Sequence, residues 1–363
     1  MSARGVHRPA TREELADLLA RASSDGDGLL VVGGGTHTPP APAGAPGLRV
    51  ARLETGALAR LVDHTPADLT VTVEGGMPAG DLEALLAEHG QCWPQADIRP
   101  GATVGGVLAA GASGRSRLRE GPVRDSLLEV VVATGDGRLV TGGGRTVKNV
   151  SGFDIPRMMV GSYGTLGVIV QATLKLWPRP AARGWFHLPG PPAELMDRAR
   201  DLVAHPSRPA SVLMSPAGLH VELAGSAADV RAPADAIPVE TGPAEPAGPA
   251  LIAVGVPPPR LGRLIDGLDA EGWPFVAQMG VGTCHVAADG AGRVRAVRAA
   301  AENLGGHAVL VRDDLGAGLD PWGAPPAGLV QMRRLRRSFD PAGILNAGRT
   351  PVDTPRPTEA GTR

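Results

Sequence analysis

The stretch from Gly142 to Leu176 reads GGGRTVKNVSGFDIPRMMVGSYGTLGVIVQATLKL. One run of glycines precedes Lys148 and Asn149, and a second set, in GSYGTLG, leads into a β-branched, apolar run. Only glycine lacks the Cβ atom that keeps a backbone away from its neighbours. Glycines gathered before a strand therefore indicate close approach to another segment or to a ligand. The stretch predicts a glycine loop followed by a strand over 165–176.

Two earlier glycine loops also adjoin regular elements. The first, Gly33-Gly34-Gly35-Thr36-His37, follows a buried strand at 29–32, and successive glycine N–H groups beside a hydroxyl form a concave donor surface that suits a phosphate. The second spans 101–106, with Thr103 as the N-cap of a helix whose free N–H groups are expected to face an anion. The run over 109–114 has almost no side-chain bulk, as expected of a wall that lies flat against a planar ligand.

A ligand that needs a phosphate cradle, a flat wall and a further glycine loop is long, anionic and partly planar. Both FAD and NAD have this character. The NAD fingerprint requires G-x-G-x-x-G between a strand and a helix. Here GSYGTLG has the spacing G-x-x-G-x-x-G and enters a strand. The residues alone therefore predict a dinucleotide and favour FAD over NAD.

Composition narrows the class of protein. The chain has 363 residues, long enough for two domains, and its formal net charge of −1 argues against a nucleic-acid footprint or a polybasic membrane patch. Cys92 and Cys284 are too few for a disulfide framework, a zinc site or an iron–sulfur cluster, so no metal site is predicted. No apolar run approaches the ~18 residues that span a bilayer. We expect a cytoplasmic protein without a transmembrane segment and without a nucleic-acid partner.

The pattern of elements changes along the chain. We predict a cofactor-binding domain over 1–180 and a second domain over 181–328, where strand-like and helical runs alternate as in an antiparallel α+β fold. A C-terminal return over 329–349 and a disordered tail over 350–363 follow. The basic helix in the return, LVQMRRLRRSF, is expected to place its arginines on a solvated face. A second group of arginines is also expected on a solvated face, although one of its members could compensate anionic charge. These are Arg115, Arg117, Arg119 and Arg124.

Eight motifs in order resemble the vanillyl-alcohol oxidase/PCMH family of FAD-binding oxidoreductases, and most of all its glycolate oxidase FAD-binding subunits. They are GGGT (33–36), GATVGG (101–106), ASG (112–114), VRD (123–125), GDGR (135–138), KNVSGFD (148–154), GSYGTLGVI (161–169) and FDPAGILNAGR (339–349). The resemblance implies an α+β fold. A PCMH-type FAD-binding domain of two α/β subdomains would be followed by an antiparallel α+β cap domain.

The resemblance also implies a role for each loop. The pyrophosphate would be gripped by Gly33, Gly34, Gly35 and Thr36, with His37 at the edge. This cradle would continue in Gly101, Thr103, Val104 and Gly106. The flavin would be lined by Ala112, Ser113 and Gly114. The adenosine side would be held by Gly164, Thr165, Leu166, Gly167, Val168 and Ile169. Asn346 would return from the far end of the chain towards the flavin.

The sequence departs from the family at two positions. Many relatives have a glutamate where Tyr163 stands, and relatives with covalently bound FAD place the bonding histidine where Thr36 stands. His37 comes one position late, so we expect non-covalent FAD. Gly34→Val is expected to abolish flavin retention, because a β-branched side chain would fill the phosphate space and resist a positive φ.

The motifs and the resemblance are compatible with two functions. In the first, the chain is an FAD-dependent oxidoreductase that acts on the CH–OH group of a small hydroxy acid such as glycolate or lactate. In the second, it is an FAD-carrying partner or assembly subunit beside a catalytic flavoprotein subunit and an iron–sulfur subunit, peripheral to the inner face of the membrane through those partners. The histidine-rich metal and substrate motif of the catalytic glycolate oxidase subunit is not visible. The candidate bases, found by elimination only, are His220, His285 and His307, and none is assigned.

Overall fold

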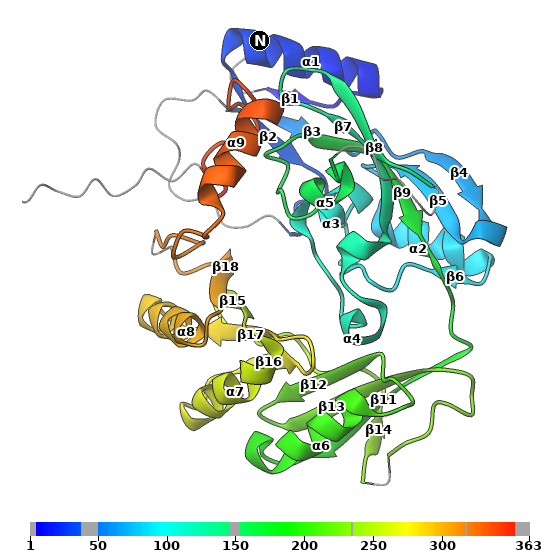
Figure 1. The fold of residues 1–363 in the computed structure, drawn as a ribbon, viewed down its shortest axis with the longest axis vertical. Coiled ribbons are helices and arrows are strands. Elements are labelled where there is room, and N and C mark those ends of the chain that lie inside the picture. Colours follow the sequence, from blue (N-terminus) through cyan, green and yellow to red (C-terminus); the bar gives the residue numbers. More distant parts are fainter. Residues whose placement is uncertain (1–4, 38–49, 146–152, 234, 317, 353–363) are drawn as a thin grey trace, which may run out of the picture.

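The computed structural model describes residues 5–37, 50–145, 153–233, 235–316 and 318–352. The KNVSG part of the KNVSGFD motif lies outside these residues. Within them the chain forms a small parallel sheet, a five-stranded sheet and an eight-stranded sheet. Figure 1 shows the first two sheets together above the third, with the C-terminal segment returning to the N-terminal part.

The parallel sheet has the order β1-β3-β2. It comprises β1 (Val6–His7), β2 (Gly28–Val32) and β3 (Val50–Glu54), with α1 (Arg12–Asp25) between the first two strands in sequence. Helix α1 begins at the capping box, where the Thr11 side chain accepts a hydrogen bond from the Glu14 N–H at 3.1 Å. Because β2 and β3 run in the same direction, their carboxyl ends meet at one edge, and the first glycine loop leaves from that edge.

The five-stranded sheet is antiparallel and has the order β4-β5-β9-β7-β8. Its strands are β4 (Leu61–Thr65), β5 (Thr70–Glu74), β7 (Leu127–Ala133), β8 (Leu139–Gly143) and β9 (Val168–Lys175). Its core is shared with α2 (Ala79–Glu88), α3 (Val104–Ala110) and α5 (Ile155–Met159). Short β6 (Gln91–Cys92) pairs with β10 (Trp177–Pro178). Strand β9 begins at Val168, after the Thr165 predicted from the sequence, because Gly164 and Gly167 have φ values of 69° and 156°.

The eight-stranded sheet is antiparallel throughout, as predicted, with the order β14-β11-β13-β12-β16-β17-β15-β18. Its strands are β11 (Ala182–Pro189), β12 (Ser211–Ser215), β13 (Gly218–Gly225), β14 (Ile237–Val239), β15 (Ala250–Gly255), β16 (Phe275–Gln278), β17 (Thr283–Ala288) and β18 (His307–Asp313). One face is covered by α6 (Pro192–Ala204), α7 (Leu261–Ala270) and α8 (Ala291–Asn303). Strand β14 lies inside the stretch 226–249, which is rich in alanine, proline and acidic residues.

The two faces of this sheet differ because side chains alternate along each strand. Phe186, Val221, Val286 and Leu310 belong to the core that the helices complete. The neighbouring histidines point the opposite way: His187, His220, His285 and His307. Figure 1 shows that this opposite face is turned toward the short helix α4 (Arg117–Glu120) and the sheets above it, while α6 and α7 lie beyond the far face.

The C-terminal segment joins the N-terminal sheet. After α9 (Leu329–Phe339), Leu345 bridges to Leu29 in parallel, and the Leu29 N–H donates to the Ile344 carbonyl at 2.8 Å. Two residues further on, the Asn346 N–H donates to the Leu29 carbonyl at 2.9 Å. The return of this segment, predicted from the sequence, therefore adds an extended strand-like edge beside β2 (Figure 1).

Arg336 departs from the prediction that the arginines of α9 coat a solvated face. Its guanidinium is buried, and Nη2 lies 3.6 Å from the buried carboxylate of Asp340 and 3.0 Å from the Leu345 carbonyl. Thr350 is also buried, and Arg333 Nε donates to the Val352 carbonyl, so the chain remains packed past the predicted start of the tail. Residues 353–363 lie outside the described residues.

Candidate functional site

The first glycine loop leaves its backbone donors free. None of the N–H groups from Gly33 to His37 donates a hydrogen bond to a residue that the structure describes. The loop lies at the carboxyl edge of the parallel strands β2 and β3, where open α/β sheets bind their ligands. Gly35, at φ 73°, turns the loop so that it encloses a pocket. Such an array of unpaired N–H groups attracts an anion.

The second loop is packed against the first. A Cβ atom added to Gly34 would stand 1.7 Å from the Gly101 carbonyl oxygen, and one added to Gly33 would stand 2.2 Å from Thr103 Oγ1. The φ of Gly34 is not positive. The positive φ expected at Gly34 is therefore wrong, and a side chain added there would strike the backbone of the second loop.

The helix after the second loop does not offer free donors. Thr103 is the N-cap of α3, as predicted, and its hydroxyl accepts the Gly106 N–H at 3.2 Å. The Val104 N–H donates to the Met77 carbonyl and the Gly105 N–H to the Gly75 carbonyl, at 2.9 and 2.7 Å. The expectation that these N–H groups face an anion is wrong, because protein acceptors occupy all three. Donors for a phosphate come from the first loop.

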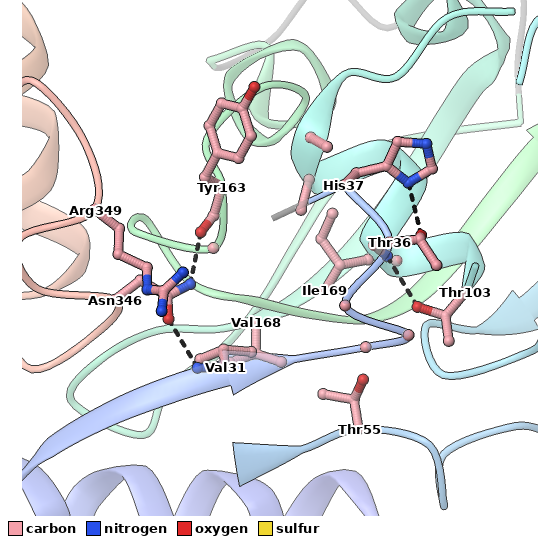
Figure 2. A pocket seen from close by; sticks show the side chains of 18 of the residues that line it. Val31, Thr36, His37, Thr55, Thr103, Tyr163, Val168, Ile169, Asn346 and Arg349 are labelled. Carbon is pink, nitrogen blue, oxygen red and sulfur yellow. Dashed lines mark hydrogen bonds between the residues drawn. The ribbon is translucent and has the colours of Figure 1, made fainter. Parts of the chain in front are cut away.

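Asn346 joins the third loop to the end of β2 (Figure 2). Its Oδ1 accepts the Val31 N–H at 2.8 Å, and its Nδ2 donates to the Tyr163 carbonyl at 2.6 Å. Nδ2 also lies where a Cβ of Gly164 would approach within 3.0 Å. The side chain therefore contacts the third loop, the one expected on the adenosine side, and holds that loop in place.

Tyr163, the residue that departs from the family motif, adopts a left-handed backbone at φ 51°. Its ring meets Trp322 edge-on with centroids 5.3 Å apart, and burial raises the pKa of its hydroxyl. Figure 2 shows the ring directed away from Asn346. The Tyr163 backbone therefore contacts Asn346, whereas its ring contacts Trp322.

Replacing Asn346 by alanine is expected to lower the free energy of unfolding by about 2 kcal/mol, because two partly buried backbone groups, the Val31 N–H and the Tyr163 carbonyl, lose their partners. FAD affinity should fall as well, since the third loop loses its attachment to β2. Urea unfolding followed by tryptophan fluorescence and flavin release on dialysis measure the two effects. An Asn346→Ala protein with unchanged unfolding midpoint and unchanged flavin retention would contradict the role of this side chain.

Most of the predicted residues line one pocket, shown in Figure 2. These are Gly33, Gly34, Gly35, Thr36, His37, Thr103, Gly106, Gly164, Gly167, Val168, Ile169 and Asn346. Ala109 and Ala110, from the small-residue run predicted as a wall for a planar ligand, also line the pocket. The rest of the lining was not assigned from the sequence: Val31, Thr55, Gly105, Tyr163 and Arg349. The positions of Val31 and Thr55 could have indicated the pocket, because both lie at or next to the carboxyl ends of strands that run parallel.

The other predicted residues lie elsewhere. Val104 is fully buried in the core, and Gly101 faces Gly34. The Thr165 hydroxyl donates to the Ser162 carbonyl at 2.7 Å, and Thr165 and Leu166 line a neighbouring cavity of about 750 Å³. The predicted flavin wall lies outside the first pocket, with Ala112 and Ser113 lining a different cavity and Gly114 close by.

That cavity, of about 690 Å³, lies between the N-terminal sheets and the histidine-bearing face of the eight-stranded sheet. It continues from the first pocket, because the two share Thr36, His37, Ala110 and Tyr163. We call it the interdomain cavity. Its far wall is formed by β15, β17 and β18 and includes His285 and His307.

A chain of charged groups crosses one side of the interdomain cavity. His37 Nδ1 lies 2.9 Å from Thr36 Oγ1, and its Nε2 lies 3.1 Å from Asp97 Oδ2. Arg99 contacts both Asp97 and Glu245, at 2.8 and 3.3 Å. Burial alone would raise the pKa of Asp97, but the hydrogen bond from His37 and the charge of Arg99 hold it below its usual value. Asp97 is therefore an anion that its neighbours already neutralise.

The three candidate bases have different surroundings. His285 Nδ1 lies 3.2 Å from Glu245, and its hydrogen bond is the main reason that the pKa of Glu245 is lowered. His307 lines the interdomain cavity on β18. His220 stacks on His187 with centroids 4.4 Å apart, and burial, the charge of His187 and that of Arg115 lower the pKa of His220 to about 4. His220 is absent from the described lining of the cavity.

The open donor loop at a parallel strand edge, the third loop and the small-residue wall are the features expected of a domain that binds FAD. Residues 3–143 match the family model described as "FAD binding domain". FAD is the cofactor of this domain.

Known proteins resemble parts of the chain. Glycolate oxidase subunit GlcE of Escherichia coli (strain K12) is 41% identical over 124 residues, 34% of this chain and 35% of that protein. D-lactate dehydrogenase of Archaeoglobus fulgidus is 32% identical over 190 residues, 52% of this chain and 42% of that protein. The match thus spans well under half the length of these relatives. A solved alkyldihydroxyacetonephosphate synthase shares the fold, with a TM-score of 0.64 and 14% identity over 93% of this chain and 76% of that one.

Among the described residues, no helix combines the length and apolar character needed to span a membrane.

Proposed function

We propose that this chain is an FAD-dependent oxidoreductase acting on the CH–OH group of a small 2-hydroxy acid, such as glycolate or D-lactate. The observation that carries the proposal is the first loop, whose free N–H groups lie at the first pocket, and this pocket continues into the interdomain cavity. The names of the relatives, a glycolate oxidase subunit and a D-lactate dehydrogenase, support the substrate class.

The residues of the two connected cavities suit FAD. The free N–H groups of the first loop suit its pyrophosphate, and the small side chains over 110–113 leave room for its planar ring. We propose the third loop, from Gly164 to Ile169, for the adenosine side and Ala112, Ser113 and Gly114 for the flavin side. When bound, FAD supplies the acceptor for the hydride that leaves the substrate carbon.

We propose that the FAD is bound without a covalent link. Thr36 stands at the position where a covalent histidine would be expected, and its hydroxyl is a partner of His37. Both ring nitrogens of His37 lie within hydrogen-bond distance of other groups, Thr36 and Asp97. The imidazole is therefore held by the protein, and its side chain is 10% exposed.

His285 is the base that we propose for the substrate hydroxyl. Glu245 orients its Nδ1–H, which leaves Nε2 as the acceptor of a proton. His285 also faces the interdomain cavity, which a base must do to reach the substrate. The neighbouring Arg99 and Arg312 keep Glu245 charged.

We further propose that the chain works as one subunit of a glycolate oxidase-type complex, with a catalytic flavoprotein subunit and an iron–sulfur subunit as partners. The similarity to subunit GlcE supports this assignment. A place in the cytoplasm, or at the inner face of the membrane through these partners, belongs to the same proposal.

Purification and anaerobic reduction test the function. The purified chain should be yellow and should release FAD on acid precipitation, which is expected of a non-covalent cofactor. Anaerobic glycolate or D-lactate should then bleach the flavin band of the chain alone. A flavin that is reduced only after partner subunits are added would assign the chain a supporting role in the complex. A colourless protein that takes up no added FAD would remove the basis of the proposal.

A further inference from the structure

Among the four clustered arginines 115, 117, 119 and 124, Arg117 is the one whose guanidinium has no hydrogen-bond or ion-pair partner in the described part of the chain. Arg115 donates to the Pro243 carbonyl at 2.6 Å, and Arg119 donates to the Ala224 carbonyl at 2.8 Å. Arg124 lies 3.5 Å from the carboxylate of Asp125. The Arg117 carbonyl accepts the Gly121 N–H at 3.1 Å, but no described residue lies within hydrogen-bond or ion-pair distance of its guanidinium. Burial lowers the pKa of its guanidinium, and the charge of Arg124 acts in the same direction.

The position of Arg117 is fixed by its neighbours. Both adjacent arginines reach carbonyl groups of the segment that contains the eight-stranded sheet, and Leu118 packs against the core of that sheet. Figure 1 shows α4 between this sheet and the two sheets above it. The backbone is therefore held on both sides of Arg117, and its half-buried side chain lines the interdomain cavity.

The interdomain cavity lacks an anion that could balance Arg117. Its described charged lining consists of Asp97, Arg99 and Arg117, together with the histidines 37, 285 and 307. Asp97, the acidic member of this set, already contacts Arg99 and His37. The adjoining 750 Å³ cavity, which Arg117 also lines, has no acidic side chain in its described lining. The charge of Asp125 acts on Arg117, but Asp125 forms its ion pair with Arg124 and lines neither cavity. A half-buried cation without an ion-pair partner of its own is costly, so this arrangement favours an anionic ligand.

A second polar atom in the same cavity is unpaired. Gln278 Oε1 is buried and has no hydrogen-bond partner among the described residues. Buried polar atoms in native proteins nearly always have a hydrogen-bond partner, so this unpaired acceptor indicates a ligand with a donor group. A 2-hydroxy acid has both features required here, a carboxylate and an adjacent hydroxyl.

We propose that Arg117 binds the carboxylate of the small acid in the interdomain cavity. The inference rests on the proposed function and adds the residue that selects a negatively charged substrate. A planar guanidinium can bind both carboxylate oxygens, which fixes the acid in one orientation. One guanidinium can bind one carboxylate, and glycolate and D-lactate each carry one.

Oxalate is a suitable probe, because it has carboxylates but no C–H bond that can be oxidised. Titration into the FAD-loaded wild-type protein should perturb the flavin absorption spectrum with a measurable Kd. In Arg117→Met the Kd should rise about tenfold to hundredfold, the usual effect of losing a hydrogen-bonded charge partner. The FAD content per chain should stay equal to that of the wild type, and Arg117→Lys should fall between the two.

Arg124→Met is the matched control, because Arg124 lies in the same segment, is exposed and is paired with Asp125. Its Kd for oxalate should equal that of the wild type. Equal losses in both variants would show a diffuse positive field and overturn the assignment to Arg117. Wild-type binding with no loss in Arg117→Met would overturn this inference alone. An FAD-loaded wild type that responds to neither oxalate nor glycolate would overturn the proposed substrate class and the inference with it.

Discussion

Gly34→Val is expected to yield a protein that retains no FAD and whose free energy of unfolding is lower by about 3 kcal/mol or more. The Cβ of residue 34 would stand 1.7 Å from the Gly101 carbonyl oxygen and 2.7 Å from the Gly101 carbonyl carbon. Backbone atoms of a packed loop cannot move aside as a flexible side chain does. The first and second loops must therefore separate, and the N–H groups from Gly33 to His37 lose the positions that make them a cradle.

Gly80→Ala is the matched control for this substitution. Gly80 lies in α2, is exposed, and has no atom within 4 Å of an added Cβ. Alanine there should keep FAD and raise the free energy of unfolding by roughly 0.5–1 kcal/mol through its better helix propensity. Flavin absorbance per chain and chemical unfolding compare the two variants. A Gly34→Val protein that folds and keeps one FAD per chain would refute the contact between the two loops as the support of the cradle.

Local signals explain why part of the site could be predicted. Thr103 as an N-cap follows from residues adjacent in sequence, and so does the glycine loop from Gly33 to Gly35. The fate of the α3 donors could not be predicted in this way. It depends on the carbonyls of Gly75 and Met77, which precede α2 and reach α3 only when the five-stranded sheet has formed. Motifs thus located the loops, and tertiary packing decided which of them has free donors.

The histidine face of the second domain was within reach of the sequence. His220 and His285 each stand between apolar residues, in LHV and CHV, and the strand period of two places such a histidine opposite the core. Which histidine meets the cofactor domain depends on strand order. Strand β17, with His285, lies third from one end of the sheet between β16 and β15, whereas β13, with His220, lies third from the other end between β11 and β12. That order is set by pairings distant in sequence.

The burial of Arg336 shows the same limit for charge patterns. The basic run of α9 is typical of a solvated helix face, and most of its arginines are not buried. Arg336 differs because the segment after the helix folds back beside β2 and brings the Leu345 carbonyl to within 3.0 Å of its Nη2. The sequence places Asp340 one helical turn after Arg336. The Arg336–Asp340 pair is buried only because the segment after α9 packs beside β2.

Asp340→Asn is expected to lower the free energy of unfolding by about 3–5 kcal/mol, the usual effect of breaking a buried ion pair. Asp340 Oδ1 and Oδ2 accept the N–H groups of Ile344 and Leu345 at 3.0 and 2.9 Å. An amide side chain would turn one of these acceptors into a donor that faces an N–H group. It would also remove the negative charge that lies 3.6 Å from the buried Arg336 guanidinium.

The loss should extend to the cofactor, because the segment that Asp340 organises places Asn346 against β2 and the third loop. Asp197→Asn is the matched control: Asp197 also pairs with an arginine on its own helix, Arg200, but its side chain is 91% exposed. That variant should change the free energy of unfolding by less than about 1 kcal/mol. Urea unfolding and flavin retention compare the two. Equal, small effects of both substitutions would mean that the C-terminal segment docks on β2 without help from the buried carboxylate, and that the third loop is held by Asn346 alone.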